Sequence, residues 1–162
     1  MACDLINLAT PGVIGLQPYQ PGKPVDELER ELGIGNIIKL ASNENPLGPG
    51  MKAKQAILSA SELSRYPDGN AHDLRMELAK FHGVNENQII IGNGSNEILE
   101  LITRAITQPQ HEVIFSEHAF AVYSLVTQAV GAKAVMVPAK DWGHDIIAMQ
   151  AAINEFTEAA CG

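Results

Sequence analysis

From residue 89 onward, the sequence alternates short β-branched runs with segments of helical periodicity. Runs of three or four apolar residues suit buried strands, whereas apolar residues at i, i+3, i+4 and i+7 form one face of a helix. This alternation predicts right-handed parallel βαβ units and an α/β fold. Three parallel strands would leave both edges of a small sheet open, so we expect an incomplete sheet. The predicted strands are 89–91, 113–115 and 134–137, and the predicted helices are 98–106, 121–130 and 146–156.

The first 24 residues are rich in proline and glycine and predict an arm. Proline fixes the backbone and lacks an N–H group, so this composition excludes a long helix or a central strand. Residues 25–32 follow Pro24 and precede Gly33, which are the start and stop signals of a short amphipathic helix. We also expect a short strand over 37–41 and helices over 51–63 and 74–81.

The charge balance excludes several classes of partner. The chain has 11 basic and 19 acidic residues, a net charge of −8 with His neutral, and no basic run. This balance disfavours nucleic acid and anionic membranes as partners. The most apolar stretch, 119–137, contains polar residues that a membrane span would have to bury, so we expect a helix, a glycine stop and a strand instead. No signal peptide is visible, and we expect a soluble cytoplasmic protein.

Metal and disulfide chemistry are not indicated by the sequence. Cys3 and Cys161 lie near opposite ends of the chain, which argues against a disulfide framework or a Cys-rich zinc site. The five histidines are scattered, and none has the spacing of a helical zinc site. We therefore expect no metal ion.

The segment 92–97, Gly-Asn-Gly-Ser-Asn-Glu, lies between a predicted strand and a predicted helix. Two glycines let backbone N–H groups turn inward, and the start of a helix adds unpaired donors and a positive partial charge. Together these features favour an anion site suited to phosphate. The alternative is an ordinary turn in which Ser95 or Asn96 caps the helix. The dinucleotide fingerprint and the P-loop both fail to match this segment.

Two other loops, 44–48 and 65–67, present polar side chains beside fixed prolines. Taken alone, the first is an ordinary Pro/Gly loop and the second a surface turn.

The order of these and other motifs along the chain indicates a protein family more specifically than either loop does. Four motifs occur in sequence: Gln-Pro-Tyr at 17–19, Ser-Asn-Glu-Asn-Pro-Leu-Gly at 42–48, Arg-Tyr-Pro-Asp-Gly at 65–69 and Gly-Asn-Gly-Ser-Asn-Glu at 92–97.

Phe-Ala-Val-Tyr at 120–123 and Gly-Ala at 131–132 complete the set. In this order, the motifs closely resemble the N-terminal part of the histidinol-phosphate aminotransferases, which are pyridoxal-phosphate enzymes of the class I/II aminotransferase fold. The resemblance covers nearly all of residues 10–156. It implies an N-terminal arm and short helix over 1–36, in contact with the small domain and a dimer partner, and a partial cofactor-binding large domain over 37–162.

The resemblance also implies which residues bind the cofactor. Gly94, Ser95 and Asn96 would cradle the phosphate of pyridoxal phosphate, with Glu97 beside them. Asn96 stands where many members of the family have Asp. Phe120 would stack on the pyridine ring, where Tyr is common.

Contacts to a partner and to the substrate follow from the same resemblance. Tyr66 would reach the cofactor phosphate of the neighbouring subunit, which implies a homodimer. Tyr19, Asn43 and Asn45 would lie near the substrate. The family reaction moves an amino group between L-histidinol phosphate and 2-oxoglutarate, with glutamate as the other amino acid, in histidine biosynthesis.

The sequence departs from the family in one essential respect. The family holds its cofactor through a Schiff-base lysine in a Ser-x-x-Lys motif, and no lysine of this chain follows Ser by three places. We therefore assign no catalytic residue and expect this chain alone to be inactive. We interpret it as a fragment truncated before that lysine, and the residues from Phe156 onward do not resemble the next strand.

Two other functions stay open from the sequence. The first is another enzyme of the same fold, such as a threonine-phosphate decarboxylase, whose motifs are similar. The second is a non-catalytic module that binds phosphate or dimerises. A generic nucleotide-binding α/β domain is a weaker third alternative.

Overall fold

A computed structural model of the chain describes residues 8–61 and 64–161, so Cys3 and the end of the predicted helix 51–63 lie outside the described residues. The described residues divide into two compact units. One unit contains residues 8–19 and 75–161, and the other contains residues 20–74. The sheet belongs entirely to the first unit.

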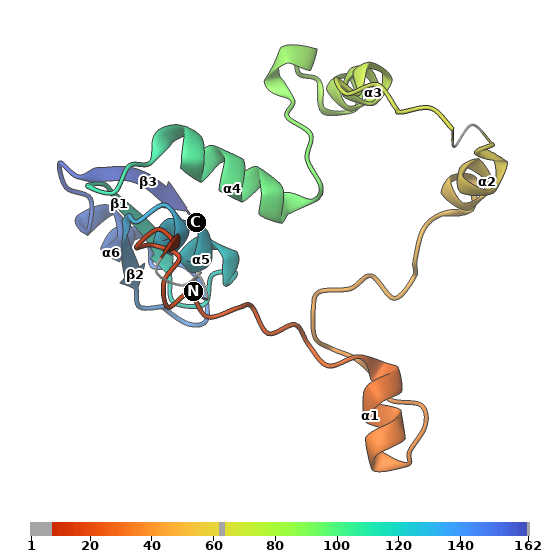
Figure 1. The fold of residues 1–162 in the computed structure, drawn as a ribbon, viewed down its shortest axis with the longest axis horizontal. Coiled ribbons are helices and arrows are strands. Elements are labelled where there is room, and N and C mark those ends of the chain that lie inside the picture. The colour runs from red at the N-terminus through yellow and green to blue at the C-terminus, as the bar shows by residue number, and fades with distance from the viewer. Residues whose placement is uncertain (1–7, 62–63, 162) are drawn as a thin grey trace, which may run out of the picture. The chain divides into compact units, whose positions relative to one another are not determined.

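The first unit is built on a parallel sheet of three strands in the order β2-β1-β3 (Figure 1). Central strand β1, Glu112–Ser116, pairs in parallel with β2, Lys133–Val137, and with β3, Thr157–Cys161. Helix α5, Val122–Ala129, connects β1 to β2, and helix α6, Ile146–Ala151, connects β2 to β3. The prediction of an α/β fold with an incomplete parallel sheet is therefore confirmed.

The core of this unit surrounds the central strand, whose five residues are all buried. Ile114 is fully buried and clusters with Val137 of β2 and Met149 of α6. Thr127 of α5 is also fully buried, and its hydroxyl donates a hydrogen bond of 2.7 Å to the carbonyl of Tyr123. Burying a hydroxyl without a hydrogen-bond partner is costly. This bond therefore allows a polar residue of α5 to be buried.

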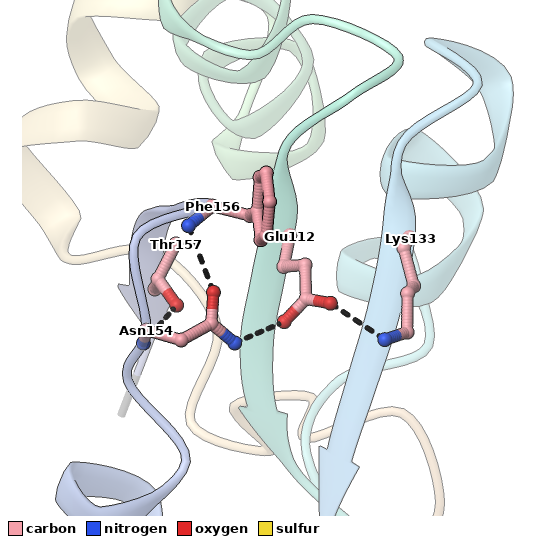
Figure 2. A network of polar contacts seen from close by, with 5 residues as sticks. All are labelled: Glu112, Lys133, Asn154, Phe156 and Thr157. Atoms are coloured by element: carbon pink, nitrogen blue, oxygen red, sulfur yellow. Dashed lines mark hydrogen bonds and ion pairs between the residues drawn. The ribbon is translucent and has the colours of Figure 1, made fainter.

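A polar network links the amino-terminal ends of the three strands (Figure 2). Glu112 begins β1 and is buried, and its two carboxylate oxygens accept from Lys133 Nζ at 2.5 Å and from Asn154 Nδ2 at 2.8 Å. Asn154 in turn accepts from the backbone N–H of Phe156 at 2.8 Å and donates its own N–H to Thr157 Oγ1 at 3.0 Å. The network thus joins the first residues of all three strands.

The electrostatics of this network favour an ionised carboxylate. The hydrogen bond from the Lys133 ammonium, followed by that from the Asn154 amide, holds the pKa of the Glu112 carboxyl below its ordinary value. A carboxylate that receives charged and neutral donors is stabilised in its ionised form.

One of the three strands differs from its prediction. Residues 89–91 form no strand, and Ile90 and Ile91 are exposed by 69% and 37%. The backbone at Ile89 is extended, as β-branched residues favour, but a strand also needs a paired neighbour, and residues 89–91 pair with none of the three strands. The third strand is instead β3, which was not predicted from the sequence.

Several element ends also differ from prediction. Helix α6 ends at Ala151 and does not continue to 156, because the Asn154 side chain accepts the Phe156 N–H and turns the backbone into β3. Helix α2, Met51–Ser59, is shorter than predicted. The expected strand over 37–41 does not form. The helix expected within 119–137, its glycine stop and the following strand are confirmed by α5, Gly131 at φ 78° and β2.

The remaining helices follow the sequence signals. Helix α1, Val25–Leu32, ends at Gly33, whose left-handed φ of 66° lets its N–H donate to the carbonyl of Glu29. Helix α3 spans His72–His82, and helix α4 spans Ser95–Ile106 and packs against α5. Within the described ranges, no helix has the length and apolar character needed to cross a membrane.

Candidate functional site

The start of α4 is preceded by a tight glycine turn. Gly94 occupies the N-cap position with a left-handed φ of 81°, and its N–H donates to the carbonyl of Gly92 at 2.8 Å. A left-handed residue in this position favours glycine. No side chain caps the helix, so the alternative of an ordinary turn capped by Ser95 or Asn96 is wrong. The space beside Gly94 is open, since no other atom lies within 4 Å of where a Cβ would be.

Glu97 fixes the shape of this turn from inside the helix. Its carboxylate oxygen Oε2 accepts from the backbone N–H of Asn93 at 2.6 Å and from the Asn93 side-chain amide at 3.2 Å. A Cβ at Gly92 would lie 2.8 Å from that oxygen and 2.9 Å from Ile98 Cδ1. The absence of a side chain at Gly92 therefore provides the space that the Glu97 carboxylate occupies.

The first turn of α4 presents the groups that an anion needs. Ser95 and Asn96 both have exposed side chains. The first N–H groups of a helix have no acceptor within the helix, and no side chain of the turn replaces one. These donors, the helix dipole and the two polar side chains can together bind a phosphate group.

Two aromatic rings meet just beyond the carboxyl end of β1. Phe120 and Tyr19 contact each other edge to face, with ring centroids 6.1 Å apart and an interplanar angle of 73°. Phe120 is 44% exposed and Tyr19 is 46% exposed, so each ring also has a free surface. Ligands of open α/β sheets bind outside the carboxyl ends of the strands, which is where this pair lies.

The loop that carries Phe120 is held by backbone contacts on both sides. The N–H of Ala119 donates to the carbonyl of Ser116, and the N–H of Tyr123 donates to the carbonyl of Phe120. Glu117 donates its N–H to the carbonyl of Val137, and its carboxylate accepts from the N–H of Ala139 at 3.1 Å. Glu117 could not be identified from the sequence, because only the folded sheet brings the ends of β1 and β2 together.

Two further predicted residues lie in the unit of residues 20–74. Asn43 has a left-handed φ of 50°, and the Asn45 side chain accepts the N–H of Leu47 at 3.0 Å. Both asparagines line an open hollow of the loop 38–46. Lys39 lines the same hollow and pairs with Glu44 at 2.6 Å.

Tyr66 belongs to the same unit and is fully exposed. Two residues further on, the Asp68 carboxylate accepts from the N–H groups of Asn70 and His72, both at 3.0 Å. The His72 N–H and then the Asn70 N–H hold the pKa of the Asp68 carboxyl below its ordinary value. Asp68 was not predicted as a site residue, although an Asp before Gly-Asn is a recognisable Asx-turn signal.

The predicted site residues are thus brought together in part. Tyr19 and Phe120 are in contact, and Gly94, Ser95, Asn96 and Glu97 form one helix start within the same unit. In the described ranges, no group of three His, Cys, Asp or Glu side chains is gathered that could hold a metal ion.

Comparison with protein families gives one match that covers most of the chain. The model of the family described as aminotransferase class I and II matches residues 35–161. Among individual proteins, the chain is 58% identical over 160 residues to histidinol-phosphate aminotransferase 2 of Pseudomonas fluorescens strain Pf-5, which covers 97% of this chain and 43% of that protein.

The histidinol-phosphate aminotransferase 2 of Pseudomonas aeruginosa is 56% identical over 154 residues, covering 93% of this chain and 42% of that protein. The chain therefore spans less than half the length of these relatives. Among solved structures, it is similar to the histidinol-phosphate aminotransferase of Sinorhizobium meliloti in complex with pyridoxal-5′-phosphate. That similarity has a TM-score of 0.77 and 26% identity, and it covers 91% of this chain and 39% of the other.

Proposed function

Because this chain belongs to the class I and II aminotransferase family, we propose that it forms the N-terminal, cofactor-binding part of a histidinol-phosphate aminotransferase. The proposed reaction of the intact enzyme transfers an amino group between L-histidinol phosphate and 2-oxoglutarate. The observation that carries the proposal is the identity of 58% with a histidinol-phosphate aminotransferase over 97% of this chain.

The proposed cofactor is pyridoxal phosphate, and the start of α4 fits its phosphate group. The space beside Gly94 is open, and the first N–H groups of the helix have no intrahelical acceptor. Ser95 and Asn96 would add hydroxyl and amide donors from the first turn. Glu97 is already bonded to Asn93, so we assign it the task of shaping the turn, without direct contact to the phosphate.

Phe120 and Tyr19 would line the other end of the cofactor. The exposed part of the Phe120 side chain would pack on the pyridine ring, and Tyr19, in edge-to-face contact with Phe120, would face the substrate. When bound, pyridoxal phosphate supplies an electron-withdrawing ring that takes up charge from the reacting substrate carbon. The contribution of these two side chains is to orient the ring and to keep water from one of its faces.

The remaining residues are proposed as partner and substrate contacts. Tyr66, which is fully exposed, would reach the cofactor phosphate of a second subunit in a homodimer. Asn43 and Asn45 would present their amides to the substrate from the loop 38–46.

No lysine of this sequence has the Ser-x-x-Lys pattern of the family, so we assign no catalytic lysine here. In the described structure, Lys23, Lys39 and Lys133 are each ion-paired with a glutamate. Amino transfer therefore requires a lysine that this sequence does not supply.

A chimera tests the proposed function. Residues 8–161 would replace the matching segment of the Pseudomonas fluorescens relative, and glutamate formation from 2-oxoglutarate would be measured with L-histidinol phosphate as amino donor. We expect activity comparable to that of the relative. A folded chimera that ignores histidinol phosphate but decarboxylates threonine phosphate would overturn the substrate assignment. One that binds pyridoxal phosphate and turns over neither compound would favour a non-catalytic module.

A further inference from the structure

The segment 8–19, which we call the N-terminal strap, is folded against the first unit. A turn begins in it where the carbonyl of Thr10 accepts the N–H groups of Val13 at 2.9 Å and Ile14 at 3.1 Å. A further bond runs from the N–H of Leu16 to the carbonyl of Val13 at 3.1 Å. The strap is therefore an ordered turn followed by an extended stretch that ends at Tyr19.

Gly12 lies at the closest approach between the strap and helix α5. A Cβ at this position would lie 2.3 Å from the carbonyl oxygen of Gln128, 2.9 Å from that of Ala129 and 2.9 Å from the N of Gly131. All three atoms belong to backbone, which cannot move aside as the end of a flexible side chain can. Only glycine lets the strap come this close to the last turn of α5.

The two ends of the strap meet opposite ends of the same helix. Gly12 contacts the C-terminal end of α5, whereas Tyr19 contacts Phe120, two residues before α5 begins at Val122. The helix has eight residues and is therefore about 12 Å long. The strap therefore has one contact at the C-terminal end of α5 and another just before its N-terminal end.

We propose that Gly12 is a positioning residue that sets the register of the N-terminal strap on α5 and thereby holds Tyr19 against Phe120. The role of this aromatic pair in facing a pyridine ring rests on the proposed function, but the anchoring by Gly12 does not. An added methyl group would lift the strap from the last turn of α5. The Tyr19 ring would then leave the Phe120 ring, although the closest contacts of Gly12 are with the backbone of α5 and Gly131.

The test compares G12A with G35A in the full chain by NMR. Gly35 is a matched control because a Cβ there has nothing within 4 Å and its φ is not left-handed. In the native chain and in G35A, we expect nuclear Overhauser effects between the Tyr19 and Phe120 rings. In G12A these should be lost while the amide shifts of β1 and β2 are retained. Persistence of the ring contacts in G12A would overturn the proposal.

Two further measurements keep the proposal testable if G12A does not fold. In the native chain, the α-protons of Gly12 should show an Overhauser effect to the amide proton of Gly131, and its absence would refute the anchor. Pyridoxal phosphate is then added to the native chain. If it leaves the Phe120 ring resonances unchanged, the proposed function fails, but the anchoring by Gly12 is unaffected.

Discussion

Glu97 has two opposite effects on the proposed anion site: its hydrogen bonds hold the turn, and its negative charge repels a bound anion. Its carboxylate holds the turn by accepting two hydrogen bonds from Asn93, yet it places a negative charge in the first turn of α4. A negative charge there interacts favourably with the helix dipole but repels a phosphate bound at the same end. The family resemblance groups Glu97 with the cofactor-binding residues, whereas its contacts are those of a residue that shapes the turn.

The substitution E97Q separates these two roles. Glutamine retains an oxygen that can accept from Asn93 and removes the charge, so the dissociation constant for pyridoxal phosphate should fall about three- to tenfold at low salt. The gain should shrink in high salt, because exposed charges are screened. Binding would be followed by titration calorimetry.

The control for this substitution is E100Q, which removes the same charge one turn further along α4. Glu100 is paired with Arg104 at 2.8 Å, so its loss should change phosphate binding less. A tenfold weaker binding of pyridoxal phosphate by E97Q would contradict this assignment and would indicate that the Glu97 carboxylate contacts the cofactor directly.

At the scale of the elements, the network around Glu112 makes the stability of the sheet depend on pH. The pKa of Glu112 is lowered in the folded chain by Lys133 and then by Asn154, so the folded value lies below the unfolded one. The stabilisation is therefore fully present above the unfolded pKa, near 4.5, and is lost as the pH falls through the folded pKa.

We predict that E112Q makes the stability of the fold less dependent on pH in this range. The midpoint of urea unfolding, followed by the fluorescence of Trp142, should fall more steeply for the native chain than for E112Q as the pH drops below about 5. The exposed Glu155 offers the control E155Q, which should behave like the native chain. Parallel profiles for the native chain and E112Q would show that the Glu112 network does not stabilise the sheet.

The elements were predictable where local pattern and tertiary environment agree. Val113–Phe115 is β-branched or aromatic and became the buried centre of β1. Residues 89–91 have an equally strong pattern but pair with no strand, which a local pattern cannot reveal. Conversely, β3 contains Thr157, Glu158 and two alanines, and it is a strand because β1 offers it an edge.

The site was predictable to a similar extent. The glycine turn before α4 could be located from its spacing, but the interaction of Glu97 with Asn93 could not, since it depends on a side-chain conformation. The contact of Tyr19 with Phe120 spans 101 positions of sequence and arises only in the folded chain, where the strap contacts the C-terminal end of α5. Resemblance to the family named both residues without indicating that they touch.

At the scale of the whole molecule, much apolar surface is exposed in the described residues. Ile90, Met136 and Ile147 are exposed by 69%, 60% and 78%, and the outer edges of β2 and β3 are unpaired within the sheet. Surfaces and edges of this kind promote association.

We therefore predict that the 162-residue chain self-associates. Its weight-average mass in sedimentation should rise with concentration, and I90K should reduce this rise because it places a charge on the exposed apolar segment. A sharp, reversible melt of a monomer, independent of concentration, would contradict this prediction.

The same chain should show no transamination by itself. With pyridoxal phosphate, L-histidinol phosphate and 2-oxoglutarate supplied, glutamate formation should not exceed that of free cofactor, because no lysine occupies the family motif. The chimera with the Pseudomonas fluorescens relative is the positive control. Turnover by the purified chain that is saturable in histidinol phosphate would show that one of its own lysines is catalytic.

The central claim is that the start of α4 and the Phe120 ring bind the two ends of pyridoxal phosphate. An NMR titration of the labelled chain tests it directly, using pyridoxal phosphate, pyridoxal and inorganic phosphate in parallel. We predict saturable shifts of the Ser95, Asn96 and Glu97 amides with both phosphate-containing probes but not with pyridoxal, and shifts of the Phe120 ring with pyridoxal phosphate. Shifts confined to lysine residues scattered over the surface, with the α4 amides unchanged, would contradict the claim.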